Sequence, residues 1–155
     1  MKFILAVSDD NKIAIGNRLP WRISHDMKWF KMNTYNNTII MGRKTFDALN
    51  RRELKNRRNI VISRNNIPGI ETIKNINQVR GMDAIVIGGA CICEQLWQKG
   101  DILILTRVHT TVPNGLEIRL PEYKELWSKD FGLYTFSINR ITSIFSYVST
   151  TEIAN

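Results

Sequence analysis

The sequence predicts an α/β fold with a mostly parallel central sheet. Short apolar, β-branched runs recur along the chain and alternate with segments of helical periodicity, which is typical of strand–helix units. Several of these runs are apolar throughout, as strands buried on both faces of a sheet are. Near the C-terminus apolar and polar residues alternate instead, which indicates an antiparallel hairpin at the end of the sheet.

The predicted elements follow from these patterns in chain order. The apolar runs predict strands at residues 3–7, 38–41, 59–63, 84–89 and 102–108. The helical patterns lie at residues 25–35, 45–50, 76–80 and 90–98. The hairpin strands are predicted at residues 134–140 and 143–150. Because no repeat, low-complexity stretch or linker interrupts this order, we expect one domain over residues 1–155.

Composition and length are those of an ordinary globular protein. The chain has 155 residues, 43% of them hydrophobic, and a domain of this size buries roughly 68–70% of its unfolded surface. No apolar run is long enough to span a membrane and no leader opens the chain, so we expect a cytoplasmic protein without a membrane partner. Cys91 and Cys93 are expected to be buried, reduced thiols. Since His25 and His109 are the only histidines, we expect no metal site.

The net charge of +8 favours an anionic partner without naming one. Nucleic acid is one such partner, because its phosphates attract lysine and arginine. A small polyanion, such as a dinucleotide or a polycarboxylate, is another. The basic residues are scattered apart from a cluster within residues 51–58, and no helix-turn-helix, RNP-type aromatic motif or zinc finger is present.

Asp26 lies in an unusual place on the predicted helix at 25–35, for which Ser24 is a suitable N-cap. The apolar stripe of this helix consists of Met27, Phe30 and Thr34. Asp26 falls on the edge of that stripe and is the only acidic residue within 11–46. One interpretation is a first-turn acid that favours the helix dipole. The other is a shielded carboxyl with a raised pKa, suited to proton transfer near neutral pH.

Three predicted strands end in residues suited to an anion. These residues are Gly42, Arg43, Lys44 and Thr45 after the second strand, Ser63 and Arg64 after the third, and Gly88 and Gly89 after the fourth. Cations sit poorly at a helix N-terminus, so a bound anion would relieve the conflict. Ligands of α/β sheets bind outside the carboxyl ends of the strands, and together these ends could hold a phosphorylated dinucleotide. A tight Gly-Gly turn and solvated basic loop residues are the alternatives.

Together and in this order, the motifs resemble the dihydrofolate reductase family along nearly the whole chain. They are "NRLPW" at 17–21, Asp26, "WF" at 29–30, "TIIMGRKTF" at 38–46, "RRNIVIS" at 57–63, "IVIGGA" at 85–90 and "LTRV" at 105–108. The resemblance implies a sheet of about eight strands with flanking helices. It also implies a monomer that uses NADPH to reduce 7,8-dihydrofolate to tetrahydrofolate, with hydride transfer to C6 and protonation of N5.

The resemblance also assigns catalytic and substrate-binding residues. Asp26 matches the acid that holds the pterin and promotes protonation of N5, Thr106 shares its polar network, and Trp21 holds an active-site water. Arg57 matches the arginine that binds the glutamate α-carboxylate, a bidentate geometry that lysine would not reproduce. The other residues matched to the substrate site are Ile4, Ala6, Met27, Phe30, Lys31, Leu49, Leu54 and Ile87.

For the cofactor, the resemblance assigns Arg43, Lys44, Ser63 and Arg64 to the 2′-phosphate. It assigns Thr45 and the Gly88–Gly89 pair, whose peptide bond is cis in the family, to the pyrophosphate. The remaining residues matched to cofactor contacts are Ala6, Ile13, Asn17, Leu19, Gly42, Ile62, Ala90, Cys91 and Ile92.

The chain departs from the family pattern at four places. Ala14 stands where the family has glycine in a mobile loop over the site, and Cys93 stands where an aromatic residue is common. Glu117 is expected to replace an aspartate that helps this loop close. Residues 50–57 are one residue longer than usual and lack two prolines and a glycine.

The register within residues 50–57 is anchored at "RRNIVIS", which assigns Leu54 and Arg57 to the substrate site. Arg51 and Arg52 are the competing arginines. Two other functions remain open at this point. One is a related pyrimidine reductase of riboflavin biosynthesis, and the other is a binding protein on the same fold without catalysis, including one that binds nucleic acid.

Overall fold

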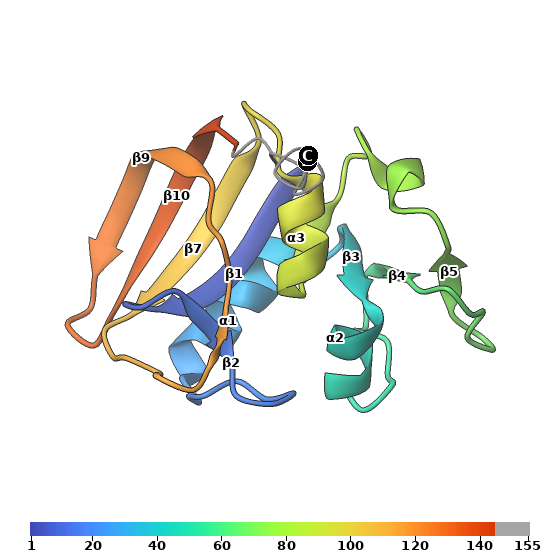
Figure 1. Ribbon diagram of the computed structural model, residues 1–155, viewed down its shortest axis with the longest axis horizontal. Coiled ribbons are helices and arrows are strands. Elements are labelled where there is room, and N and C mark those ends of the chain that lie inside the picture. The colour runs from blue at the N-terminus through green and yellow to red at the C-terminus, as the bar shows by residue number, and fades with distance from the viewer. Residues whose placement is uncertain (145–155) are drawn as a thin grey trace, which may run out of the picture.

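The computed structural model describes residues 1–144 and contains one large sheet and one small one (Figure 1). Within these residues the large sheet has eight strands in the order β5-β4-β3-β6-β1-β7-β10-β9. They span Lys2–Ser8 (β1), Thr38–Gly42 (β3), Arg58–Ile62 (β4), Glu71–Ile73 (β5), Ile85–Gly88 (β6), Ile102–Val108 (β7), Glu122–Asp130 (β9) and Tyr134–Ser143 (β10). The small sheet pairs β2 (Lys12–Ala14) with β8 (Leu116–Glu117).

The large sheet is mostly parallel, which confirms the predicted fold class. Strands β5, β4, β3, β6, β1 and β7 pair in parallel, whereas β10 pairs antiparallel with both β7 and β9. Successive side chains of the central strands enter two different apolar clusters, one containing Phe3 and Leu5 and the other containing Ile4. Both faces of the sheet are therefore buried, as the uniformly apolar runs predict.

Four short helical segments accompany the sheet in the described part of the chain. They are α1 (Ser24–Thr34), α2 (Arg43–Ala48), the 3₁₀ turn η1 (Ile76–Val79) and α3 (Ala90–Leu96). Phe30 of α1 and Phe46 of α2 pack with Ile4, whereas Cys93 of α3 packs with Phe3. Figure 1 accordingly shows α1 and α3 on opposite faces of the sheet.

The prediction that Ser24 caps α1 is wrong, because Ser24 is already the first helical residue. Ile23 occupies the N-cap position, its carbonyl accepts from the Met27 N–H, and no side chain caps the helix. The predicted helix at 76–80 is a single 3₁₀ turn. The Asn75 side chain accepts from the Asn77 N–H and starts that turn, and the Gly81 that follows has φ 76°.

The C-terminal hairpin is present, but its strands differ from the predicted pair. β10 runs on to Ser143, and its partner β9 precedes it, so no turn separates residues 140 and 143. Strand β9 was missed because it lies at the sheet edge with both faces largely exposed, which leaves "EYKELWSKD" without an apolar alternation. Residues 145–150 of the predicted second strand lie outside the described residues.

The two cysteines lie in different environments. Cys93 is buried and burial raises the pKa of its thiol, but Cys91 is exposed, which corrects the prediction that both are buried. On α3 their directions diverge, so only one faces the sheet. Within residues 1–144 no group of three or more His, Cys, Asp or Glu side chains could hold a metal ion. Over the same residues, no helix has the length and apolar character needed to cross a membrane.

Candidate active site

The site centres on the first turn of α1, where Asp26 meets the middle of the sheet. Thr106 of β7 is 1% exposed and its hydroxyl donates a hydrogen bond of 2.6 Å to Oδ1 of Asp26. Burial raises the pKa of the Asp26 carboxyl, and the Thr106 hydrogen bond and the nearby His25 oppose part of that rise. The two interpretations of Asp26 coexist, since this first-turn acid is also a shielded carboxyl that binds protons more readily than a solvated aspartate.

Trp21 lies five residues before Asp26, in the segment that leads into α1. The indole Nε1 of Trp21 is buried and donates to no residue within 1–144. Buried donors almost always have a partner, so this N–H is suited to a water or a ligand. Trp21 and Pro20 also line a cavity of about 280 Å³ against residues 110–114.

The apolar residues matched to the substrate site gather in one place. The cluster beneath α1 contains Ile4, Phe30, Leu49, Leu54 and Ile87. Ala6 of β1 pairs directly with Thr106 across the sheet, which places it beside the acid's partner. Met27 is different, because its side chain is 57% exposed and does not shield Asp26 as the helical stripe suggested.

A buried asparagine holds the segment that lacks the family's prolines and glycine. Asn59 is 4% exposed; its Oδ1 accepts from the Leu54 N–H at 2.9 Å, and its Nδ2 donates to the carbonyls of Leu54 and Arg57, each at 2.9 Å. Asn50, Arg51 and Asn56 adopt positive φ, which asparagine tolerates well. The Asn59 side chain thus does for residues 54–57 what rigid prolines would do.

Arg57 lies at the C-terminal end of α1. Its Nε donates to the Thr34 hydroxyl at 2.9 Å and its Nη1 to the Lys55 carbonyl at 2.7 Å. The Tyr35 ring lies 5.8 Å from the guanidinium carbon and 6.0 Å from Nζ of Lys31, so both cations flank one ring. Partial burial lowers the pKa of Arg57, and Tyr35 opposes that shift.

The competing arginine at position 51 is engaged elsewhere. Nε of Arg51 donates to Asp47 on α2 at 3.0 Å, and the side chain of Arg52 is exposed. Arg57, by contrast, contacts the last turn of α1 and Tyr35, and Leu54 packs on the same apolar cluster as Phe30.

The three strand ends suited to an anion lie side by side, because β4, β3 and β6 are neighbours in the sheet. Ser63 and Arg64 follow β4, α2 begins directly after β3 with Arg43, Lys44 and Thr45, and Gly88–Gly89 ends β6 with a cis peptide bond. The positive charge of Arg43 at the start of α2 is partly balanced within the helix, because its Nε donates to the Asp47 carboxylate at 3.3 Å.

The Gly88–Gly89 pair and Thr45 form a cradle that side chains would fill. Gly88 has φ 142°, and a Cβ there would lie 3.2 Å from the Thr45 hydroxyl oxygen. A Cβ at Gly89 would lie 3.5 Å from the same oxygen. Glycine thus lets the backbone and this hydroxyl face a common ligand at close range.

Residues 11–23 form a loop that is tied to the segment 109–118 by the small sheet. Lys12 pairs with Glu117 and Ala14 with Leu116. Residue 14 is alanine here, and the glycine that allows the two segments to approach closely is Gly115 on the opposite segment. A Cβ at Gly115 would lie 2.9 Å from the Lys12 Cβ and 3.0 Å from the Ala14 carbonyl oxygen.

The other residues matched to the cofactor form two groups, one exposed on the loop and one in the apolar cluster. Asn17 and Leu19 are exposed on this loop. Those that pack on or within the cluster beneath α3 are Ile13, Ile62, Ala90 and Ile92.

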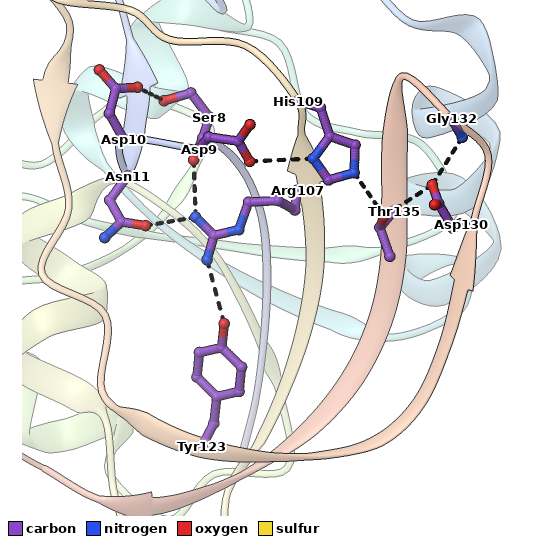
Figure 2. Close-up of polar contacts among 10 residues, drawn as sticks. All are labelled: Ser8, Asp9, Asp10, Asn11, Arg107, His109, Tyr123, Asp130, Gly132 and Thr135. Atoms are coloured by element: carbon purple, nitrogen blue, oxygen red, sulfur yellow. Dashed lines mark hydrogen bonds and ion pairs between the residues drawn. The ribbon is translucent and has the colours of Figure 1, made fainter.

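Sequence reasoning missed a polar network at the root of the loop (Figure 2). Arg107 contacts Ser8, Asn11 and Tyr123, and Asp10 accepts from the Ser8 hydroxyl and from the Val112 N–H. Alternation along "LTRV" would have placed Arg107 opposite Thr106. No local pattern could have identified its partners. Asn11 lies 96 residues before Arg107 in the sequence, and Tyr123 lies 16 residues after it.

The family model for dihydrofolate reductase matches residues 1–133 of this chain. The chain belongs to the dihydrofolate reductase family. A dihydrofolate reductase from Buchnera aphidicola subsp. Acyrthosiphon pisum is 35% identical over 131 residues, which cover 80% of each protein. The dihydrofolate reductase of Haemophilus influenzae is 34% identical over 138 residues, 84% of this chain and 85% of that enzyme.

Solved structures of dihydrofolate reductases share the fold. One is the dihydrofolate reductase from Enterococcus faecalis, solved in complex with NADP(H) and RAB-propyl, which superposes with a TM-score of 0.76. It covers 90% of this chain and 94% of its own, at 20% sequence identity. The likeness extends over the whole fold of this chain, including its eight-stranded sheet.

Proposed function

We propose that this protein is an NADPH-dependent reductase that converts 7,8-dihydrofolate to 5,6,7,8-tetrahydrofolate. Its family membership supports this reaction, and the observation that carries it is the shielded Asp26 carboxyl bound to Thr106 at 2.6 Å. The proposal also covers the roles of the site residues below.

The strand-end site fits a phosphorylated dinucleotide. Its cations follow the neighbouring strands β3 and β4, and the Gly88–Gly89 cradle at the end of β6 leaves room beside the Thr45 hydroxyl. Arg43, Lys44, Ser63 and Arg64 would hold the 2′-phosphate, and Thr45 with the two glycines the pyrophosphate. When bound, NADPH supplies the hydride that reduces the substrate.

Asp26 supplies the proton-handling group. Its carboxyl would hold the pterin's amino group and ring nitrogen and favour protonation of N5, which makes C6 a better hydride acceptor. A raised pKa serves this task because the group exchanges protons closer to neutral pH than an ordinary aspartate does. Thr106 would fix the carboxyl through its hydrogen bond, and the buried N–H of Trp21 would orient a water beside the pterin.

The other residues of the proposed substrate site suit a flat aromatic substrate with an anionic tail. The apolar wall at Ile4, Phe30 and Ile87 excludes water from stacked rings. Arg57 and Lys31 at the end of α1 would bind the glutamate carboxylates of the substrate.

Turnover by the purified protein tests the proposal directly. With NADPH and dihydrofolate, we expect the near-ultraviolet absorbance of NADPH to fall at a rate proportional to enzyme concentration. Replacing dihydrofolate with a ribosylated aminopyrimidine should abolish the signal, which separates this reaction from that of the pyrimidine reductases. Consumption of NADPH with the aminopyrimidine and not with dihydrofolate would overturn the proposal.

We also infer that the enzyme acts as a cytoplasmic monomer of one domain that needs no nucleic acid or membrane. The free thiols of Cys91 and Cys93 suit a reducing compartment. Gel filtration should give the mass of a single chain, and salt-sensitive retardation of DNA in a gel would contradict the inference about nucleic acid.

A further inference from the structure

Two consecutive residues of β7 bind the two ends of one segment. The Thr106 hydroxyl binds Asp26, at the end of residues 11–26, and the Arg107 guanidinium binds Asn11, at their beginning. Neighbouring residues of a strand point to opposite faces of the sheet. Thr106 therefore binds one end of the segment on one face, and Arg107 binds its other end on the opposite face. That segment contains Trp21 and the loop residues matched to the cofactor.

The contacts of Arg107 are specific to a guanidinium (Figure 2). Nη1 donates to the Ser8 carbonyl at 2.9 Å and to Oδ1 of Asn11 at 2.6 Å, while Nη2 lies 3.3 Å from the Tyr123 hydroxyl of β9. One planar group therefore joins the last residue of β1, the first loop residue and the edge of the sheet. An ammonium group on a lysine stem cannot reach in these directions at once.

Asn11 is the point where the chain changes direction. It has φ 59°, in the left-handed region that asparagine tolerates, and its N–H donates to the Ser8 carbonyl at 3.0 Å. Its own carbonyl accepts from the Ile118 N–H at 2.9 Å. Asp10 does not compete for Arg107, because its Oδ1 accepts from the Val112 N–H at 3.0 Å and from the Ser8 hydroxyl.

We propose that Arg107 is a positioning residue that fixes the root of the loop 11–23 through Asn11 and so sets that loop over the reaction site. The inference rests on the proposed function for its catalytic consequence. The partners of Arg107 are Ser8, Asn11 and Tyr123, none of which is assigned to substrate or cofactor. It acts by holding the left-handed turn from which the loop leaves β1, while the β2–β8 pairing holds the loop further along.

A matched pair of variants at Asn11 isolates the hydrogen bond from the backbone. Asn11→Gly allows positive φ but removes the acceptor, whereas Asn11→Asp keeps both the acceptor and a tolerated conformation. We expect amide hydrogen exchange over residues 11–23 to rise about tenfold or more in Asn11→Gly and to stay within about twofold of wild type in Asn11→Asp. Exchange in β1 and β7 should not change.

Cofactor affinity gives a second readout, because Ile13, Asn17 and Leu19 lie in the anchored loop. The dissociation constant for NADPH should rise by a similar factor in Asn11→Gly and in Arg107→Met. The double variant should resemble Arg107→Met alone, since that substitution already removes the hydrogen bond to Asn11. Tyr123→Phe removes only the longest of the three contacts and should behave as wild type.

The outcomes separate this inference from the proposed function. Unchanged exchange over 11–23 in both Asn11→Gly and Arg107→Met would overturn Arg107 as an anchor, whatever the activity of the protein. Additive effects in the double variant would do the same. Faster exchange in a protein that does not reduce dihydrofolate would support the anchor while refuting the reaction. If Arg107→Met fails to fold, the Asn11 pair decides the matter alone.

Discussion

At the scale of single residues, the surroundings of Asp26 decide its chemistry. Its sequence position would suit an ordinary first-turn acid, and only burial against the sheet raises the pKa of the carboxyl. The hydrogen bond from Thr106 limits that rise in pKa and also holds Oδ1 of Asp26 in place. The carboxyl is therefore oriented, and it still binds a proton more readily than a solvated aspartate. Two predictions follow from this balance, one for activity and one for stability.

The first concerns activity and pH. The protonated fraction of Asp26 falls as the pH rises through its raised pKa, so the rate of hydride transfer should fall over the same range. Asp26→Asn removes this proton source, and we expect kcat/KM at neutral pH to drop by about 10²–10⁴-fold, with partial recovery at low pH where the substrate carries its own proton. Steady-state rates across pH measure this. A pH profile of the variant parallel to that of wild type would contradict the role.

The second concerns stability. Because the carboxyl binds protons more tightly in the folded state, the contribution of Asp26 to the stability of the wild type falls as the pH rises from about 4 through the raised pKa. Asp26→Asn removes the buried charge, and its carbonyl oxygen can still accept from Thr106. The variant should therefore melt at a higher temperature than wild type at pH 7, with a gap that narrows toward pH 4. Equal melting temperatures at pH 7 would show that the carboxyl is effectively solvated.

At the scale of elements, loops depend on side chains that lie outside them. The segment 54–57 takes its shape from Asn59, the second residue of β4, and the loop 11–23 depends on Gly115 for close packing against residues 12–14. The glycine expected at position 14 and the prolines and glycine expected within residues 50–57 are absent, yet the geometry of both segments is held by a neighbouring strand or loop.

Asn59 offers a test at this scale. Asn59→Ala would leave the Leu54 N–H and two carbonyls without their partner, so we expect the free energy of unfolding to fall by about 1–3 kcal/mol. Because Leu54 and Arg57 move with this segment, KM for dihydrofolate should rise while KM for NADPH stays constant. Denaturant unfolding and steady-state kinetics measure the two effects. Asn56→Gly, at an exposed position of the same turn, serves as a control, because glycine keeps the positive φ accessible and the substitution removes none of these three hydrogen bonds.

At the scale of the whole molecule, the order of strands in the sheet brings together the residues of the proposed cofactor site. Residues 43–45, 63–64 and 88–89 come together because β4, β3 and β6 are adjacent, although they are separated along the chain. Scattered cations thus become one positive edge. Together with the cations near Arg57, this edge accounts for part of the net charge of +8.

Discrimination between cofactors tests this assembly. Lys44→Ala and Arg64→Ala should each raise KM for NADPH by about tenfold and leave KM for NADH nearly unchanged, because only NADPH carries the 2′-phosphate that these cations would bind. Arg58→Ala removes a cation of β4 that is paired with Glu71, and it serves as the control. A uniform loss with both cofactors would indicate structural damage in place of lost phosphate recognition.

The sequence by itself determined the fold class and most strands, because strands buried on both faces must be apolar, and it supplied the candidate site residues. It did not reveal the edge strand β9, whose exposed faces need no apolar pattern. Only the tertiary structure decided that Asp26 meets Thr106, that Asn59 holds Leu54 and Arg57, and that Arg107 holds Asn11. Such contacts join residues that are distant in sequence, or depend on the conformation of a turn. Local sequence periodicity predicts neither.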